Sequence, residues 1–143
     1  MKKAEVAISR EIQKNAEMAI TTLDTISDKV YDDTFALQIA RETLKYSDIR
    51  NRVVDKLLQG KAEPYNSNLL TGLMIKSGIH MNTALNTSTS HIAEIMIRGS
   101  NRGILDICKM LNRYPELKGQ AMEMAKEFID FEEKNIERLK KYL

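Results

Sequence analysis

The sequence has few of the residues that interrupt helices or cross-link a chain. Its 143 residues include two prolines, six glycines, one cysteine and no tryptophan. The lone Cys108 excludes an intramolecular disulfide and suggests a reducing compartment. With no alternating Val/Ile/Thr runs between turn residues, helix is the only secondary structure that the periodicity supports. We therefore predict an all-α protein.

The chain also lacks a strong excess of either charge and any long hydrophobic run. Its 22 Lys and Arg are interspersed with 20 Asp and Glu, and a net charge of +2 argues against a nucleic-acid partner. The most apolar window, 69-LLTGLMIKSGIHM-81, is interrupted by Lys76 and His80 and is too short to span a membrane, so we expect no membrane insertion. The start, MKKAEVAISREIQ, has no apolar run typical of a signal sequence. These features predict a bacterial-type cytoplasmic protein.

Apolar residues recur at steps of three and four along most of the chain, which is the pattern of amphipathic helices. Four segments of about 25 residues, 4–30, 33–59, 89–113 and 115 to the end, have the proportions of a four-helix bundle within one domain, 1–143. In the second segment the predicted inward positions are Phe35, Ile39, Tyr46, Ile49, Val53 and Leu57. We expect Asp33 to cap its start, Gly60 to end it, and Pro115 to begin the last helix.

A shorter apolar segment, 67–86, lies between the second and the fourth. Its apolar positions are Leu69, Leu70, Leu73, Met74, Ile79 and Leu85. The run 86-NTSTS-90 that follows is rich in side chains that compete for backbone hydrogen bonds, so a kink or short break is expected there. The pattern leaves open whether 67–113 is one kinked helix or two.

An internal repeat relates the second helix to the last. Residues 36-ALQIARETLKYSD-48 align on 121-AMEMAKEFIDFEE-133 at a constant offset, with Ala, Glu and aromatic positions in common. The alternative is that two amphipathic helices resemble each other through composition alone. A true repeat would give two helical hairpins related by a pseudo-two-fold axis and joined by a long crossover at 61–90.

The chain resembles the ferritin-like superfamily, most sharply in 131-FEEKNIERLKKYL-143. Metal-binding members hold two metal ions with Glu from two helices and Glu-x-x-His from two others, whereas this stretch has Glu132 and Asn135. The resemblance implies an up-down four-helix bundle of the ferritin-like type with a long crossover carrying an extra or kinked helix.

The positions that would hold metal are degenerate. Glu132 lies in the apolar stripe and Asn135 flanks it, while the repeat places Ser47 and Arg50 at the matching positions of the second helix. In the fourth segment, Ser100 is in register with the apolar residues. One carboxylate beside a guanidinium is a poor cage for a divalent ion, so we predict no metal and no cofactor. We expect Glu132 to pair with Arg50 in the space that metal would fill.

Two glycines sit in the middle of the fourth segment, where glycine costs helix stability. Gly99 and Gly103 have the spacing that lets a neighbouring backbone or large side chain approach closely. A functional alternative is that they open a pocket beside the helix for a ligand.

No motif in the sequence carries a reaction, so we expect a protein that is not an enzyme. The leading hypothesis is a binding or structural role, with a possible homodimer through a helical face or an unidentified protein partner. A divergent iron- or manganese-binding bundle, with ligands such as Glu42, Glu127, Glu132 and His91, is the alternative. A signalling or adaptor function would predict an exposed apolar groove.

Overall fold

The computed structural model describes residues 1–84 and 86–143, which form helices joined by loops. Five α-helices are found in these residues: α1 (Lys3–Ile26), α2 (Asp33–Gln59), α3 (Leu69–Thr83), α4 (Thr89–Arg113) and α5 (Gln120–Leu139). Short 3-10 turns, Ser27–Lys29 and Lys140–Tyr142, follow α1 and α5. The prediction of an all-α fold is confirmed.

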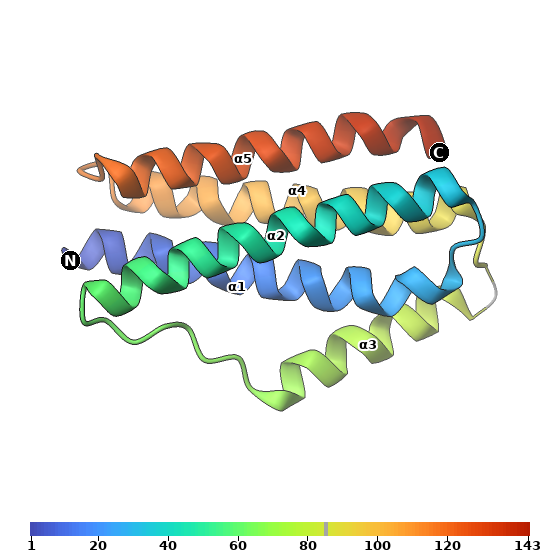
Figure 1. The fold of residues 1–143 in the computed structure, drawn as a ribbon, viewed down its shortest axis with the longest axis horizontal. Helices are drawn as coiled ribbons and strands as arrows, with labels where there is room; N and C mark the ends of the chain where they lie inside the picture. Colours follow the sequence, from blue (N-terminus) through green and yellow to red (C-terminus); the bar gives the residue numbers. More distant parts are fainter. Residues whose placement is uncertain (85) are drawn as a thin grey trace.

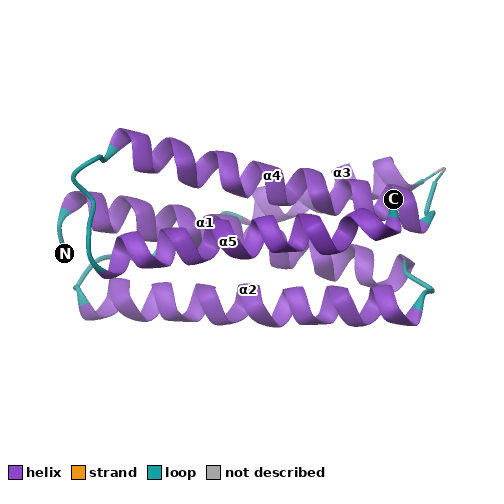
Figure 2. Cartoon of the chain, turned by 90° about the horizontal axis from the view of Figure 1, so that it is seen from above, coloured by secondary structure: helices purple, strands orange, loops and turns teal. Residues whose placement is uncertain are grey.

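The four long helices lie side by side, and α3 lies on the outside of α1 (Figure 1). Helices α1 and α2 form one antiparallel hairpin, and α4 and α5 form the other, as the view from above also shows (Figure 2). The connection between α2 and α4, which overlaps the crossover predicted at 61–90, carries the chain back along the outside of the first hairpin through α3. As a result α2 and α4 run in the same direction, and the middles of all four long helices surround one core.

The core is built from the stripes that the periodicity indicates. All six inward positions predicted for α2, from Phe35 to Leu57, are buried. Ile8, Ile12 and Ala16 of α1 are buried as well, and the core continues into Ala125 and Phe128 of α5. The local pattern therefore determines which side of each long helix faces inward.

Several helix ends differ from the expected ones. Asp32, not Asp33, caps α2, because its side chain accepts a hydrogen bond from the backbone N–H of Phe35 at 2.7 Å. Helix α5 begins at Gln120 rather than at Pro115. Leu117 is buried just after α4 ends, and Gly119 has a φ of 73°, which is not a helical conformation. The chain therefore turns at these residues, and α5 begins after them.

The region 67–113 forms two helices. Helix α3 ends at Thr83 and α4 begins at Thr89, where the Ser88 side chain accepts a hydrogen bond from the backbone N–H of His91 at 3.2 Å. The expected break therefore falls in the polar run, and Leu85 lies outside the described residues.

Most of the described apolar positions of 67–86 face solvent. Only Ile79 of the five described positions is buried. The other four, Leu69, Leu70, Leu73 and Met74, are between 53% and 84% exposed, because α3 packs mainly on α1 and lies outside the four long helices.

Candidate functional site

A cluster of polar side chains occupies the middle of the core. Glu132 of α5 is 2% exposed, and its Oε1 accepts a hydrogen bond from the Tyr46 hydroxyl of α2. The Ser100 hydroxyl of α4 donates to the same oxygen at 3.5 Å. Asn135 Nδ2 donates to the Tyr46 oxygen at 3.4 Å. Three helices are thus tied together through one carboxyl group.

Packing around Tyr46 fixes this arrangement. Its ring meets the edge of Phe131 with the centroids 4.8 Å apart, and Phe128 lies on another side at 6.4 Å. Because both phenylalanines belong to α5, they hold the hydroxyl of Tyr46 at the level of Glu132.

A second carboxyl group, Glu42 of α2, is buried beside the cluster. It is 3% exposed, and its Oε2 accepts a hydrogen bond from Gln38 at 2.9 Å. The sequence prediction missed Glu42 among the inward residues of α2. The spacing could have identified it, because the predicted inward positions Ile39 and Tyr46 are seven residues apart. Glu42 lies three residues after Ile39 and four before Tyr46, on the same side of the helix.

The two carboxyl groups hold their protons at unusually high pH. Burial raises the pKa of Glu132 to about 8, against the opposing hydrogen bond from Tyr46, and the charge of Glu42 adds to the rise. Burial also raises the pKa of Glu42 to about 7, although the hydrogen bond from Gln38 and the charge of Arg138 oppose it. The pKa of Tyr46 is raised well above its usual value by burial and by Glu132. Near neutral pH this cluster therefore retains protons that exposed carboxylates would have lost.

Arg50 lies elsewhere, and the prediction that it pairs with Glu132 is wrong. Its Nε donates to Glu17 of α1 at 3.1 Å, and its side chain is 44% exposed. Ser47 is only partly buried. Each residue turns a helix by about 100°, so Tyr46 faces inward and its neighbour Ser47 is rotated away. The repeat therefore gave the wrong register for α2, while Ser100, Glu132 and Asn135 are buried as expected.

The two glycines of α4 have different surroundings. A Cβ on Gly103 would collide with the Glu132 carboxylate and come within 3.4 Å of the Phe128 ring, so this glycine makes room for a large side chain as predicted. A Cβ on Gly99 would meet nothing within 4 Å. Close packing therefore explains Gly103 and does not explain Gly99.

Gly99 lies at a cavity of about 100 Å³ that enters the core between α1 and α4. Apolar side chains, including Met18, Leu23 and Met96, form much of its wall. Glu42, Tyr46, Ser100 and Glu132 also line it. The cavity thus connects the outer surface with the buried carboxyl groups.

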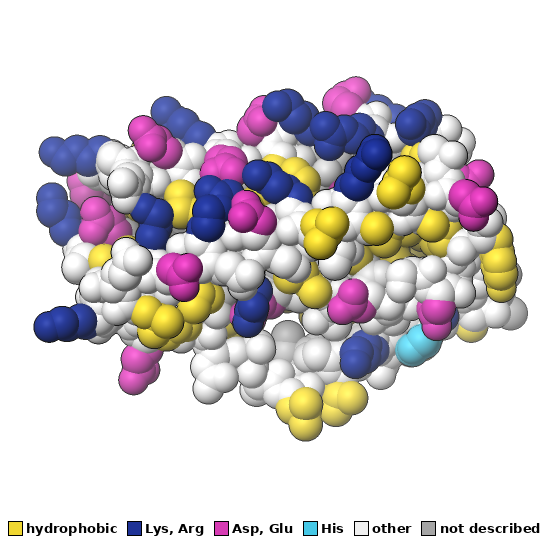
Figure 3. All heavy atoms as spheres, in the orientation of Figure 1, with side chains coloured by type: hydrophobic (Ala, Val, Ile, Leu, Met, Phe, Trp, Pro, Cys, Tyr) yellow, Lys and Arg dark blue, Asp and Glu magenta, His cyan; other side chains and the backbone are white. Residues whose placement is uncertain are grey.

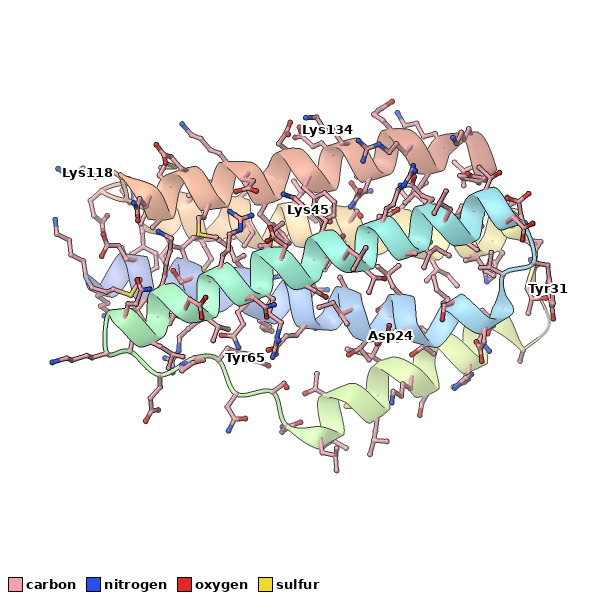
Figure 4. The ribbon with its side chains drawn as sticks, viewed as in Figure 1. Asp24, Tyr31, Lys45, Tyr65, Lys118 and Lys134 are labelled. Carbon is pink, nitrogen blue, oxygen red and sulfur yellow. The ribbon has the colours of Figure 1, made fainter. Side chains whose placement is uncertain are left out.

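On the other side of the bundle, a polar groove of about 450 Å³ runs between α2 and α5. Lys45 and Lys134 lie along it (Figure 4). Glu127, one of the alternative metal ligands, is here bonded to Arg52 at 2.6 Å and to Lys45 at 3.1 Å. The hydrogen bond from Arg52 lowers the pKa of Glu127 to about 2. Glu127 therefore belongs to a surface ion-pair network.

The alternative ligand set is only partly assembled. Glu42 and Glu132 line the same cavity, whereas His91 lies in the first turn of α4 and contacts the backbone oxygen of Asn82 at 2.8 Å. No group of three His, Cys, Asp or Glu side chains is placed to hold a metal ion in residues 1–84 and 86–143. Of the four proposed ligands, only the carboxyl groups of Glu42 and Glu132 therefore lie at the same place.

The surface of α3 is the other candidate site. Its exposed apolar side chains are Leu69, Leu70, Leu73, Met74 and Met81. Apolar atoms are visible at the lower edge of the molecule, where α3 begins (Figure 3). Among the helices described, none has the length and hydropathy needed to cross a membrane.

Comparison with known proteins assigns no family to the chain. No family model matches it, and no curated protein or solved structure matches it. The function is therefore inferred from the contacts and surfaces of the molecule itself.

Proposed function

We propose that this protein is a non-enzymatic ferritin-like helical bundle that acts by protein association, with the outer face of α3 as its docking surface. The observation that carries the proposal is the exposure of five large apolar side chains on one short helix. Large contiguous apolar surface is rare on soluble monomeric proteins and marks interaction sites.

Helix α3 is apolar on two sides. Ile79 and the half-buried Ile75 face the bundle, while Leu73 and Met74 face outward. An apolar side of a helix is normally buried against another element. Since α1 covers one side, a partner is needed to cover the other.

The segment around α3 is nearly free of charge. Between Glu63 and Glu94 the only Lys, Arg, Asp or Glu is Lys76, although these four types make up 29% of the chain. Charged residues are depleted at the centres of protein interfaces. An uncharged apolar face is also compatible with itself across a two-fold axis, which favours a second copy of the chain as the partner.

The ferritin-like part of the proposal is supported by topology and by the polar cluster. The chain has two antiparallel hairpins and a long crossover, and Glu132 and Asn135 lie three residues apart in mid-bundle. In this proposal the cluster is a degenerate metal centre, in which the hydroxyl groups of Tyr46 and Ser100 bond to Glu132.

The test is the mass of the protein in solution before and after the α3 face is made polar. Wild-type protein should show twice the 16.4 kDa chain mass by light scattering, and a Leu73→Glu/Met74→Glu variant should be monomeric. Leu58→Glu is the matched control, because Leu58 is 58% exposed on α2, outside α3, and its variant should remain dimeric. A wild-type protein that stays monomeric at the highest soluble concentration would contradict association with a second copy.

A second candidate function is metal binding by a divergent bundle. It is favoured by the two carboxyl groups, Glu42 and Glu132, that line one cavity. Elemental analysis separates the candidates: the association proposal expects no stoichiometric iron or manganese. Stoichiometric metal that is lost in Glu132→Gln would support the second candidate instead.

A further inference from the structure

The cavity between α1 and α4 has the size of a small organic molecule. Its volume is about 100 Å³. An apolar cavity of about 150 Å³ in another protein holds benzene, so this one has room for roughly four non-hydrogen atoms. Met18, Leu23 and Met96 supply apolar wall for an alkyl group of that size.

The entrance to the cavity is kept clear of side chains. Gly99 is exposed there and its missing Cβ leaves open space. Arg102, the charged residue at the same edge, is 72% exposed and bonds to Asp106 at 3.3 Å. A small molecule can therefore reach the cavity without displacing a packed side chain.

The inner end of the cavity lacks a positive charge. Glu42 and Glu132 both reach it, and neither has a Lys, Arg or His nitrogen within 4.0 Å in the described part of the chain. Glu132 accepts hydrogen bonds from the Tyr46 and Ser100 hydroxyls, and Glu42 accepts one from Gln38. Glu42 also borders the groove between α2 and α5, where Arg41, Lys45 and Arg138 lie, and the charge of Arg138 acts on it from there. Buried carboxylates without a cation are strongly disfavoured, so Glu132 is mostly protonated near neutral pH and Glu42 is partly protonated there.

The hydrogen bonding around these groups is also incomplete. Asn135 donates to the Tyr46 hydroxyl, yet its own Oδ1 is fully buried with no donor among the described residues. Buried side-chain oxygens in native proteins nearly always have a partner. Once Glu42 and Glu132 have released their protons, the cluster therefore offers more acceptors than the surrounding chain has donors.

From these four observations we infer that the cavity binds a small primary alkylammonium ion. The ammonium group lies between the carboxyl groups of Glu42 and Glu132, and the alkyl group lies against Met18 and Met96. An ammonium group has three donors and no acceptor, which matches a cluster rich in acceptors. The apolar wall favours an organic cation over a hydrated metal ion, which would gain nothing from Met18 and Met96.

The first experiment compares two probes of equal size, n-propylammonium and 1-propanol, by NMR titration of the ¹⁵N-labelled full chain. Saturable binding of propylammonium at the amides around Gly99 and Ser100, with propanol at least tenfold weaker, is the expected result. Equal affinity for the two probes, or no saturable binding of propylammonium, would overturn the inference.

Isosteric variants test the carboxyl groups. Glu132→Gln and Glu42→Gln should each weaken propylammonium binding at least tenfold, whereas the surface control Glu94→Gln should leave it unchanged. Gly99→Leu, which touches neither carboxyl group, should also weaken binding by narrowing the entrance. Unchanged affinity in the three cavity variants would show that the probe binds elsewhere and would end the proposal.

Proton release gives a readout that needs no variant. An ammonium ion between the carboxyl groups lowers their pKa, so binding near pH 7 releases protons from Glu42 and Glu132 to the buffer. Tyr46, whose pKa is raised well above its usual value, remains protonated throughout. Arg102 at the edge of the cavity and Arg138 near Glu42 are the other charged groups that face this site. Calorimetry in buffers of different ionisation enthalpy should show this release for propylammonium, and binding without proton release would contradict the assigned position of the ammonium group.

Discussion

The hydroxyl of Tyr46 donates a hydrogen bond to the carboxyl of Glu132 at the centre of the bundle, which joins α2 to α5 through two buried polar groups. This contact takes the place of the ion pair with Arg50 that the sequence suggests. It makes the core sensitive to changes of a single polar atom, because removing the donor of a buried carboxyl costs free energy.

Replacing Tyr46 with phenylalanine should therefore destabilise the protein by about 1–3 kcal/mol. The variant keeps the ring that packs on Phe131 and removes only the donor to Glu132. Urea unfolding near pH 7 measures the change. Tyr31→Phe is the control, because Tyr31 is 89% exposed and its free energy of unfolding should stay at the wild-type value.

The stability of the protein should fall as pH rises from about 5 to 8. In the folded state burial raises the pKa of Glu132 to about 8 and that of Glu42 to about 7, from an ordinary value of 4.5. The folded state therefore binds more protons than the unfolded state in this window. The stabilisation that these protons give is complete below pH 4.5 and is lost as the pH rises through the folded-state pKa values of the two groups.

The slope should approach about 1.4 kcal/mol per pH unit for each proton that the folded state retains. Urea unfolding across the window measures it, and Glu132→Gln should reduce it. Glu127→Gln is the contrasting variant, since the pKa of Glu127 is lowered by Arg52 and its contribution is lost only in acid. A flat profile in wild-type protein would show that the carboxyl groups are not buried in their protonated form.

The two glycines of α4 should respond to alanine in opposite directions. Gly103→Ala places a methyl group on the Glu132 carboxylate and should cost about 1–3 kcal/mol through overpacking. Gly99→Ala meets only open space and should stabilise the helix by up to about 1 kcal/mol. Thermal unfolding of the two variants measures the difference, and each variant serves as the control for the other. Destabilisation by both substitutions would mean that Gly99 is also closely packed.

Arg50→Ala should lower the free energy of unfolding by less than about 1 kcal/mol. Arg50 pairs with Glu17 between α2 and α1, and this ion pair is partly exposed to solvent. Had Arg50 paired with Glu132 inside the bundle, the loss would have been about 3–5 kcal/mol. Chemical unfolding of the single variant distinguishes the two arrangements. A loss of stability of about 3–5 kcal/mol would support the buried ion pair between Arg50 and Glu132 instead.

The sequence by itself determined the helices and their buried sides. The spacing of the apolar residues from Phe35 to Leu57 identifies the inward side of α2, and the polar run 86-NTSTS-90 predicts the break between α3 and α4. Such features depend on residues a few positions apart, so periodicity and capping are enough to predict them.

Only the tertiary structure decided which polar residues meet. A rotation of about 100° per residue separates Tyr46, which reaches Glu132, from Ser47, which does not, and the repeat could not fix that register. Helix α3 is apolar on two sides, so its periodicity could not indicate which side the bundle covers. The cavity with Glu42 and Glu132 likewise depends on residues from four helices, and their spacing along the chain carries no information about the distances between helices.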